Sequence, residues 1–346
     1  MADSTLDFAV IGSGPLCLLL AGLLAGTHGR STVLVGDRPS PFLLRRGLSL
    51  SAAPLTNPQT WAMLRAVVPE TLRILRTLGA GSFERIDPLL VAHSDASRTL
   101  LSHIRHIASG FGIAAERETR GGIEACRLRD SALIDPVRLA ELAAPWLAGS
   151  GVAWLPARNA EVTLRRDGGV RIRSGETSLE AAQAVLADDD SLLAHFGDLL
   201  EGAIFTSILT EPAARLRAPL QHHLDSGVTL LQHGAGQITA IAPGEADSAA
   251  ATTAAALAGQ MRRAGEVSYR ILATADGGPL FGALRPSRVI AIGGFGAIAP
   301  FLAPAIARVL AGAASEPEAA YFSARSPGKG RGAAADIGPR PMAVAA

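Results

Sequence analysis

The sequence predicts an α/β fold in which a mainly parallel sheet is interrupted by an inserted antiparallel sheet. Three observations support this fold class. Residues 8–35 read as an apolar strand, a glycine turn, an apolar helix and a second apolar strand, which is the pattern of a parallel β-α-β unit. Similar segments recur later, separated by blocks with the character of antiparallel hairpins. Finally, 48% of the 346 residues are hydrophobic, enough for a large core.

Capping and turn signals place the individual elements. In the first unit, we expect strands at residues 8–11 and 31–35 around a helix from residue 15 to about residue 27. Asn57-Pro58 and Asp135-Pro136 each put an N-cap residue before a proline, which predicts that helices begin there. Further strands are expected at residues 89–93, 122–128, 161–164, 170–172, 184–187, 204–210, 228–232 and 237–241. Among them, residues 204–210 are expected to pair with residues 228–232 in an antiparallel sheet.

Two other expectations concern helices. The helix that begins after Asn57 should reach Gly79, with an interruption near Pro69. An alanine-rich helix is expected over residues 249–264.

The order of these segments predicts two domains and a tail. Parallel-type units are split by the antiparallel blocks, so the first domain should be discontinuous. It comprises residues 1–80, 130–195 and 270–322, the second domain comprises residues 81–129 and 196–269, and a disordered tail rich in Gly, Pro, Ala and Arg covers residues 323–346.

Composition excludes several functional classes. The formal net charge is +1, which gives no electrostatic footprint for nucleic acid or an anionic membrane. Lys329 is the only lysine, and it lies in the predicted tail. Schiff-base enzymes and P-loop ATPases need a lysine held inside the fold, so both are disfavoured. Cys17 and Cys126 are far apart in sequence, which disfavours a zinc ribbon or a disulfide scaffold.

Sequence signals for export or membrane insertion are weak. The first residues are acidic and lack the basic region of a secretory signal. Residues 289–307 carry no charge, but their glycines and prolines fit a strand, a turn and a helix better than a membrane span. We therefore expect a soluble, cytoplasmic protein.

The glycine turn Gly12-Ser13-Gly14-Pro15 predicts a site for a dinucleotide. The first glycine permits the tight turn, and the second lets a diphosphate approach the backbone at the helix N-terminus. Cys17 stands where the pattern usually has a third glycine. Asp37 ends the second strand, where a carboxylate can accept hydrogen bonds from ribose hydroxyls. The alternative is an ordinary β-α turn with a surface aspartate.

A second motif near the end of the chain carries a family resemblance. Arg270, the segment Asp276-Gly277-Gly278-Pro279, a strand and the turn Gly293-Gly294-Phe295-Gly296 follow in that order. With the first motif, this arrangement resembles the FAD-dependent D-amino-acid oxidase superfamily, in particular its glycine/sarcosine oxidase branch, over roughly residues 6–315. The resemblance implies a Rossmann-like FAD-binding domain of the GR2 type with an inserted antiparallel-sheet substrate domain.

The resemblance also implies roles for individual residues. Arg270 would pair with a substrate carboxylate, with Tyr269 beside it, because a planar guanidinium binds a carboxylate bidentately. Residues implied to contact FAD are Gly12, Ser13, Gly14, Pro15, Asp37, Arg38, Ser49, Val162, Gly293, Gly294, Phe295 and Gly296. Arg38 would also suit the 2′-phosphate of NADP, but an arginine after the acidic residue is common where FAD binds, so FAD is favoured.

Three departures from the family pattern stand out. Asp188-Asp189-Asp190 replaces a turn of small residues, and these carboxylates would repel a diphosphate unless they point to solvent. The C-terminal glycine turn continues as Ala297-Ile298-Ala299 without a last glycine. No lysine is available beside the flavin, where some family oxidases use one for oxygen reduction.

No metal site is predicted. His103 and His106 are three residues apart and His222 and His223 are adjacent, but a third ligand cannot be placed, so structural histidines are favoured. Asp130 and Asp135 fit turn and cap positions better than acid–base roles.

The sequence thus favours an FAD-dependent oxidoreductase that oxidises a C–N bond of a small amine or amino acid by hydride transfer to flavin. One alternative is a flavin-dependent monooxygenase, because Ala187-Asp188-Asp189-Asp190-Ser191 faintly resembles the A-D-G-x-x-S segment of that group. Another is a degenerate, non-catalytic subunit or maturation factor. A partner subunit or an electron-acceptor protein is compatible with the first interpretation.

Overall fold

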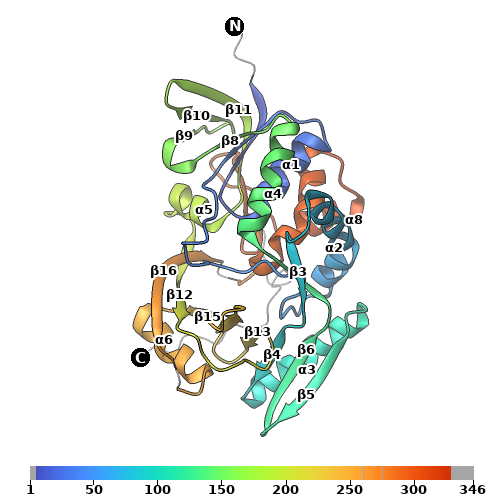
Figure 1. Cartoon of the computed structure of the whole chain (residues 1–346). Coiled ribbons are helices and arrows are strands. Elements are labelled where there is room, and N and C mark those ends of the chain that lie inside the picture. Colours follow the sequence, from blue (N-terminus) through green and yellow to red (C-terminus); the bar gives the residue numbers. More distant parts are fainter. Residues whose placement is uncertain (1–4, 260, 275, 329–346) are drawn as a thin grey trace.

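Two large sheets organise the molecule. The computed structural model describes residues 5–259, 261–274 and 276–328. The first sheet lies in the upper half of Figure 1 and the second in the lower half. Each sheet has eight strands among the described residues, and a separate two-stranded sheet pairs β3 (Phe83–Ile86) with β7 (Ser131–Ile134).

The first sheet has a parallel centre. Strand β1 lies between β11 and β2 and is parallel to both, and β18 and β8 extend the parallel set on the two sides. Strands β17, β10 and β9 join by antiparallel pairing. Its strands are β1 (Leu6–Ile11), β2 (Thr32–Val35), β8 (Ala153–Leu155), β9 (Glu161–Leu164), β10 (Val170–Ser174), β11 (Thr177–Leu186), β17 (Leu280–Ala283) and β18 (Ile290–Gly293).

Side-chain alternation gives the first sheet two buried faces. Val10 and Leu34 pack with helix α1 in one apolar cluster, whereas Ala9, Ile11 and Val33 belong to a second cluster on the other face. Successive residues of a strand point to opposite faces, so a strand buried on both sides reads as a continuous apolar run. This is why residues 8–11 and 31–35 were recognisable in the sequence.

The second sheet has the order β16-β12-β15-β14-β13-β4-β6-β5. Its pairs are antiparallel, except that β13 and β4 are parallel. Its strands are β4 (Leu89–Ala92), β5 (Ala115–Arg120), β6 (Ile123–Leu128), β12 (Glu201–Thr210), β13 (Leu220–His223), β14 (Thr229–Gln232), β15 (Ile238–Pro243) and β16 (Arg263–Ala273).

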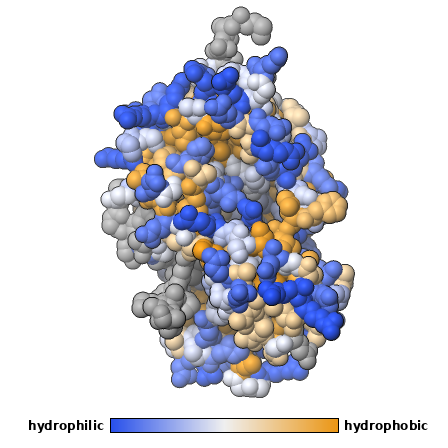
Figure 2. Space-filling model, turned by 90° about the vertical axis from the view of Figure 1, so that its left-hand side faces the viewer, coloured by the Kyte–Doolittle hydropathy of each residue, from blue (hydrophilic) through white to orange (hydrophobic). Residues whose placement is uncertain are grey.

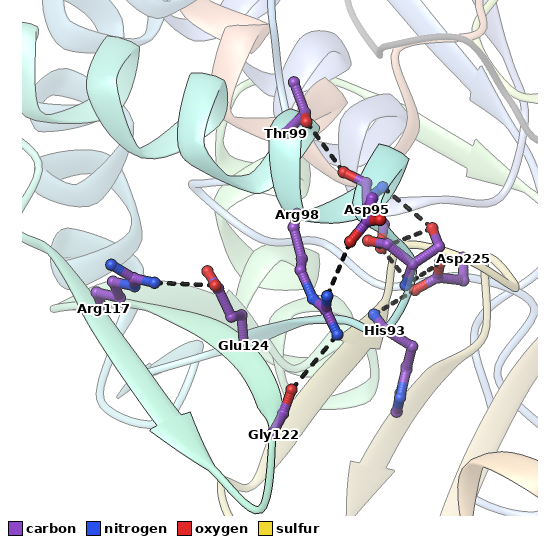
Figure 3. A network of polar contacts seen from close by, with 10 residues as sticks. His93, Asp95, Arg98, Thr99, Arg117, Gly122, Glu124 and Asp225 are labelled. Carbon is purple, nitrogen blue, oxygen red and sulfur yellow. Dashed lines mark hydrogen bonds and ion pairs between the residues drawn. The ribbon is translucent and has the colours of Figure 1, made fainter.

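One hydrogen-bond network braces the second sheet. The carboxylate of Asp225, in the turn after β13, accepts the backbone N–H groups of His93 and Ser94 and the Ser97 hydroxyl at 2.8–3.0 Å (Figure 3). Partial burial raises the pKa of Asp225, but these hydrogen bonds outweigh it and lower the pKa to about 2. Arg98 extends the network to Asp95 at 2.9 Å.

Helices pack mainly on the first sheet, where α1, α4, α2 and α8 lie together on the right of Figure 1. The helices are α1 (Pro15–Gly26), α2 (Pro58–Leu78), α3 (Asp95–Gly110), α4 (Pro136–Gly149), α5 (Asp189–Phe196), α6 (Ala246–Ala256), α7 (Ala303–Ala311) and α8 (Glu316–Ser323), with short 3₁₀ helices η1 (Ala157–Asn159) and η2 (Gly296–Leu302). Both predicted N-caps are confirmed: Asn57 accepts the N–H of Gln59, and Asp135 accepts those of Val137 and Arg138.

Several expected elements differ from the structure. Helix α2 is continuous across Pro69, because the helix is held by packing along its buried face despite the proline. The alanine-rich helix ends at Ala256 rather than residue 264, and strand β16 begins at Arg263. Strand β12 pairs with β15 and β16, not with β14. These errors concern pairing and boundaries, which depend on contacts distant in sequence.

Packed structure also continues beyond residue 322, where the tail was expected to begin. Helix α8 reaches Ser323, and Arg325 is fully buried, with its guanidinium 3.5 Å from the centre of the Tyr321 ring. The tail predicted from residue 323 therefore starts too early, because these residues pack onto the core. Residues 329–346, the rest of that predicted tail and the position of Lys329, lie outside the described residues.

All strands of the first sheet fall within the stretches predicted for the first domain, and the strands of the second sheet fall within the others, except that β16 continues to Ala273, past the predicted boundary at residue 269. The division into domains itself stays a prediction.

On the face shown in Figure 2, polar residues cover the two ends and apolar residues gather in the upper half and around the middle. In the described part of the chain, no single helix is long and apolar enough to cross a membrane; one bent pair, Gly296–Ala311 with Glu316–Ser323, meets that test by length and composition only.

Candidate functional site

A cavity of about 2090 Å³ lies where the two sheets meet. Residues that follow β1, β2, β11 and β18 border it on one side, and β12 to β16 supply residues on the other. Strand order reverses around β1, and ligands of open α/β sheets bind beyond the carboxyl ends of the strands at such a point. The cavity is therefore the natural place for a bound dinucleotide.

The N-terminal glycine loop borders this cavity in a closely packed form. Gly12 has φ +142°, a backbone conformation that residues other than glycine rarely adopt. Its carbonyl oxygen would lie only 2.0 Å from a Cβ on Gly36, so Gly36 must also lack a side chain. The Ser13 hydroxyl accepts the backbone N–H of Asp37 at 2.9 Å, which ties the loop to the end of β2.

Helix α1 starts directly at the cavity. Its N-cap residue, Gly14, provides no side-chain cap, and Pro15 occupies the first turn. No atom lies within 4 Å of the position that a Cβ on Gly14 would take, and Gly14 lines the cavity. A helix N-terminus with uncapped N–H groups and open space in front of it suits an anionic group such as a diphosphate.

Asp37 carries an unsatisfied oxygen. Its Oδ1 atom is buried and has no hydrogen-bond partner among the described residues, while Asp37 as a residue lines the cavity. Buried polar atoms are nearly always paired, so this oxygen fits a donor supplied by a ligand, such as a ribose hydroxyl. Arg38 also lines the cavity, and its guanidinium lies 4.5 Å from the centre of the Trp154 ring.

The C-terminal glycine loop borders the same cavity. Gly293, Gly294, Phe295 and Gly296 all line it. A Cβ on Gly293 would lie 2.5 Å from the Leu192 side chain and 2.6 Å from the Leu272 side chain, so a larger residue there would have to displace both leucines.

Not every predicted site residue reaches the cavity. Ser49 lines it, and the neighbouring Leu50 N–H donates to the Ala297 carbonyl at 2.8 Å. Gly12 lies behind the loop and is not among the lining residues. Val162, expected near an adenine, packs against the second apolar cluster of the first sheet and does not line the cavity. The contact roles of all these residues stay predictions.

The acidic run after β11 enters the cavity wall instead of pointing away from the fold. The Asp188 carboxylate accepts the Ser13 N–H at 2.6 Å and the Ser191 N–H at 2.8 Å, which caps α5. Asp189 interacts with the backbone of Leu272 and Gly294. Asp190 is exposed and pairs with Arg46 at 2.9 Å.

Enclosure in the protein changes the acidity of two of these groups. Both Asp188 and Asp189 line the cavity, so their remaining accessible surface faces it. Desolvation by burial raises the pKa of Asp188, and it raises that of Asp189 to about 6. From the sequence, the three carboxylates were expected to repel a diphosphate unless they point to solvent. Of the three, Asp190 alone is exposed.

Tyr269 and Arg270 lie on opposite faces of β16, because they are consecutive strand residues. Tyr269 is buried, and the Arg46 guanidinium lies 5.9 Å from the centre of its ring. Desolvation by burial raises the pKa of Tyr269. The exposed Arg270 borders the cavity too, but its guanidinium covers Gly202, where a Cβ would lie 2.7 Å from Nε.

Among the polar residues of the cavity wall, Arg46 was not singled out from the sequence, and the histidines were weighed there only as metal ligands. Arg46 precedes Ser49 by three positions, and the Arg45-Arg46 pair was the available signal. His222 Nδ1 lies 2.8 Å from Thr229 Oγ1, and His233 Nε2 lies 2.8 Å from Thr239 Oγ1. Burial and the nearby His223 lower the pKa of His222 to about 4. Among the residues described, no group of three or more His, Cys, Asp or Glu could hold a metal ion.

Comparison with known proteins finds similarity in structure only. No protein-family model matches the sequence, and no curated protein matches it by sequence. The solved L-proline dehydrogenase from P. horikoshii superposes with a TM-score of 0.70 at 15% identity, covering 92% of this chain and 96% of that one. Glycine oxidase from Bacillus cereus gives 0.67 at 14% identity, covering 90% and 96%.

A third solved structure is the L-α-glycerophosphate oxidase from Mycoplasma pneumoniae with FAD bound, with a TM-score of 0.68 at 14% identity, covering 88% of this chain and 93% of that one. These similarities extend over nearly the whole length of both partners. They confirm the fold class predicted from the sequence: this chain has the fold of these solved dehydrogenase and oxidase structures.

Proposed function

We propose that the protein binds FAD and oxidises a C–N bond of a small amine or amino acid. The observation that carries this proposal is the convergence of the two glycine loops and the unpaired Asp37 oxygen on one cavity. These segments lie more than 250 positions apart in the sequence, as the numbering of Gly14 and Gly294 shows. The structures with the same fold include two oxidases and a dehydrogenase, one of them with FAD bound.

The residues present fit the cofactor. The N-terminus of α1, with Ser13, Gly14 and Pro15, would face the diphosphate, and Asp37 would accept hydrogen bonds from the adenosine ribose. The loop from Gly293 to Gly296 would lie along the flavin. When bound, FAD supplies the hydride acceptor, and the protein supplies binding and orientation.

The wall opposite the glycine loops would hold the substrate. Phe205, Ile241 and Ile271 give it an apolar surface, and Tyr269 adds a hydroxyl. Arg46 lies beside Tyr269 and forms an ion pair with the exposed Asp190, so a substrate carboxylate could exchange with that partner. The geometry favours Arg46 for the contact that the family resemblance gives to Arg270, whose role stays a prediction. Holding the substrate near the flavin would make the transfer effectively unimolecular.

The purified protein's visible spectrum tests the cofactor. We expect oxidised-flavin absorbance in the protein as isolated or after addition of FAD, and anaerobic bleaching by members of a panel of amines and amino acids. Protein that never acquires flavin absorbance would contradict the proposal and favour the non-catalytic alternative.

The monooxygenase alternative has one supporting observation, the contact of Asp188 with the Ser191 N–H within the A-D-x-x-S segment. Flavin that is bleached by NADH or NADPH, but by none of the amines, would establish that alternative.

A further inference from the structure

The shortest hydrogen bond to the N-terminal glycine loop comes from a carboxylate, where the family pattern has small residues. Asp188 Oδ2 accepts the Ser13 N–H at 2.6 Å, and Oδ1 accepts the Ser191 N–H at 2.8 Å. A single carboxylate thus joins the turn after β1 to the first turn of α5. Bonds from N–H groups to a carboxylate are stronger than those between neutral groups.

Ser13 passes this constraint to the next segment. Its hydroxyl accepts the Asp37 N–H at 2.9 Å, so Asp188, Ser13 and Asp37 form a continuous chain across the ends of β11, β1 and β2. The chain terminates at the residue whose Oδ1 is buried and unpaired. The position of that oxygen therefore depends on a side chain of a different strand.

Cys17 completes the arrangement. Its Sγ atom would lie 2.7 Å from a Cβ on Gly12, and the Asp188 carboxyl carbon would lie 2.8 Å from the same point. Cys17 is fully buried, and its Sγ lies 3.6 Å from the Ala187 carbonyl oxygen. The two departures from the nucleotide-binding pattern, Cys17 and Asp188, thus enclose Gly12 from two sides.

We propose that Asp188 is a positioning residue for FAD: through Ser13 it fixes both the glycine loop that faces the diphosphate and Asp37, which faces the ribose. In this proposal, the repulsion between the Asp188 charge and the diphosphate weakens FAD binding less than the fixed loop geometry strengthens it. This inference rests on the proposed function, because it assumes that FAD is the ligand. It differs from the expectation from sequence, in which these carboxylates would repel the diphosphate unless they point to solvent.

Titration of the purified apoprotein with FAD, followed by the change in flavin fluorescence, tests the inference. We expect Asp188→Asn to raise the dissociation constant about tenfold, because an amide has one acceptor oxygen for two N–H groups. Asp190→Asn is the matched control: it removes a negative charge from the same run but touches neither the loop nor Ser13, so affinity should stay within about twofold. Tighter binding by Asp188→Asn would overturn the proposal in favour of repulsion, and unchanged binding would overturn it as well.

Ser13→Ala keeps the backbone N–H that Asp188 accepts and removes only the hydroxyl, so it provides a second test if Asp188→Asn fails to fold. We expect weaker FAD binding here too. The dissociation constant of the double variant, with Asp188→Asn and Ser13→Ala, should exceed that of the weaker-binding single variant by no more than about twofold, because both changes act on one chain of contacts. If the double variant instead shows the product of the two single-variant increases in the dissociation constant, the two residues act independently, which would contradict the proposal.

ADP, measured by calorimetry, isolates the nucleotide half of the site. We expect Asp188→Asn to weaken ADP as much as FAD; an effect on FAD alone would place the action of Asp188 elsewhere. If the parent protein binds neither ligand, the proposed function fails first, and that result is distinct from every outcome among the variants.

Discussion

Single residues at the cavity show how a sequence motif acquires its meaning from its surroundings. Arg270 and Tyr269 are neighbours in sequence, yet the pleat of β16 separates their side chains. Arg46, from a loop more than 200 positions away by its numbering, is the cation that lies over the Tyr269 ring. A shift of one position in a strand moves a side chain to the other face of the sheet. A sequence motif can therefore be present although its expected side chain does not face the substrate.

This geometry predicts the effect of removing each arginine. Arg46→Ala should raise the KM for carboxylated amines about 10- to 100-fold, because a hydrogen-bonded charged contact contributes about 1.5–3 kcal/mol. Arg270→Ala, the matched control, should change KM by less than about twofold. Steady-state kinetics with carboxylated and uncarboxylated substrates checks both. The reverse ranking of the two variants would assign the carboxylate to Arg270.

Asp189 predicts a pH dependence of stability. Burial raises its pKa in the folded state to about 6, from 3.8. Between these values the folded protein holds the proton more tightly than the unfolded chain, so this group's contribution to stability is present below pH 3.8 and is lost as the pH rises to 6.

Asp189→Asn should therefore become more stable relative to the parent protein as the pH rises from 4 to 6. Denaturant unfolding at several pH values measures this difference. The adjacent, exposed Asp190→Asn should run parallel to the parent over the same range. A difference between Asp189→Asn and the parent that does not vary with pH would refute the prediction.

At the scale of elements, local sequence signals predicted where helices begin, but they did not predict where the alanine-rich helix ends or which strands pair. Asn57 and Asp135 cap helices as predicted, because capping involves only residues two or three positions away. Pro69 does not interrupt α2, and the alanine-rich helix ends at Ala256, eight residues before the expected residue 264. Long-range packing decides these cases.

Helix capping gives a prediction for α2. Asn57→Ala removes the acceptor for the Gln59 N–H, which lies 2.9 Å away. The free energy of unfolding should fall by about 1 kcal/mol. Arg65→Ala, an exposed substitution within the same helix, should change it by less than about 0.5 kcal/mol. Denaturant unfolding measures both variants, and equal effects would show that the cap contributes nothing.

At the scale of the whole molecule, the cavity is formed by both sheets together. The loops after β1 and β18 come from one sheet, and Tyr269 and His222 come from the other. A ligand that touches both walls should stabilise the folded protein as a unit, because it binds the native state alone.

Added FAD should therefore raise the temperature of thermal unfolding in a concentration-dependent manner. At 100 times the dissociation constant, the gain corresponds to about 2.7 kcal/mol. Differential scanning calorimetry follows the shift, with Asp188→Asn requiring more FAD for the same gain. An unfolding temperature that is independent of FAD concentration would contradict binding at this cavity.

The sequence alone determined the β-α-β unit, the helix starts, the two glycine loops and, through their order, the fold class. These features depend on local steric and hydrogen-bonding preferences that neighbouring residues express by themselves. The tertiary structure decided that Asp188 binds Ser13, that Arg46 rather than Arg270 accompanies Tyr269, and that the unpaired oxygen of Asp37 borders the cavity. Strand register and the packing of distant segments set these contacts, and neither is encoded in any single stretch of the chain.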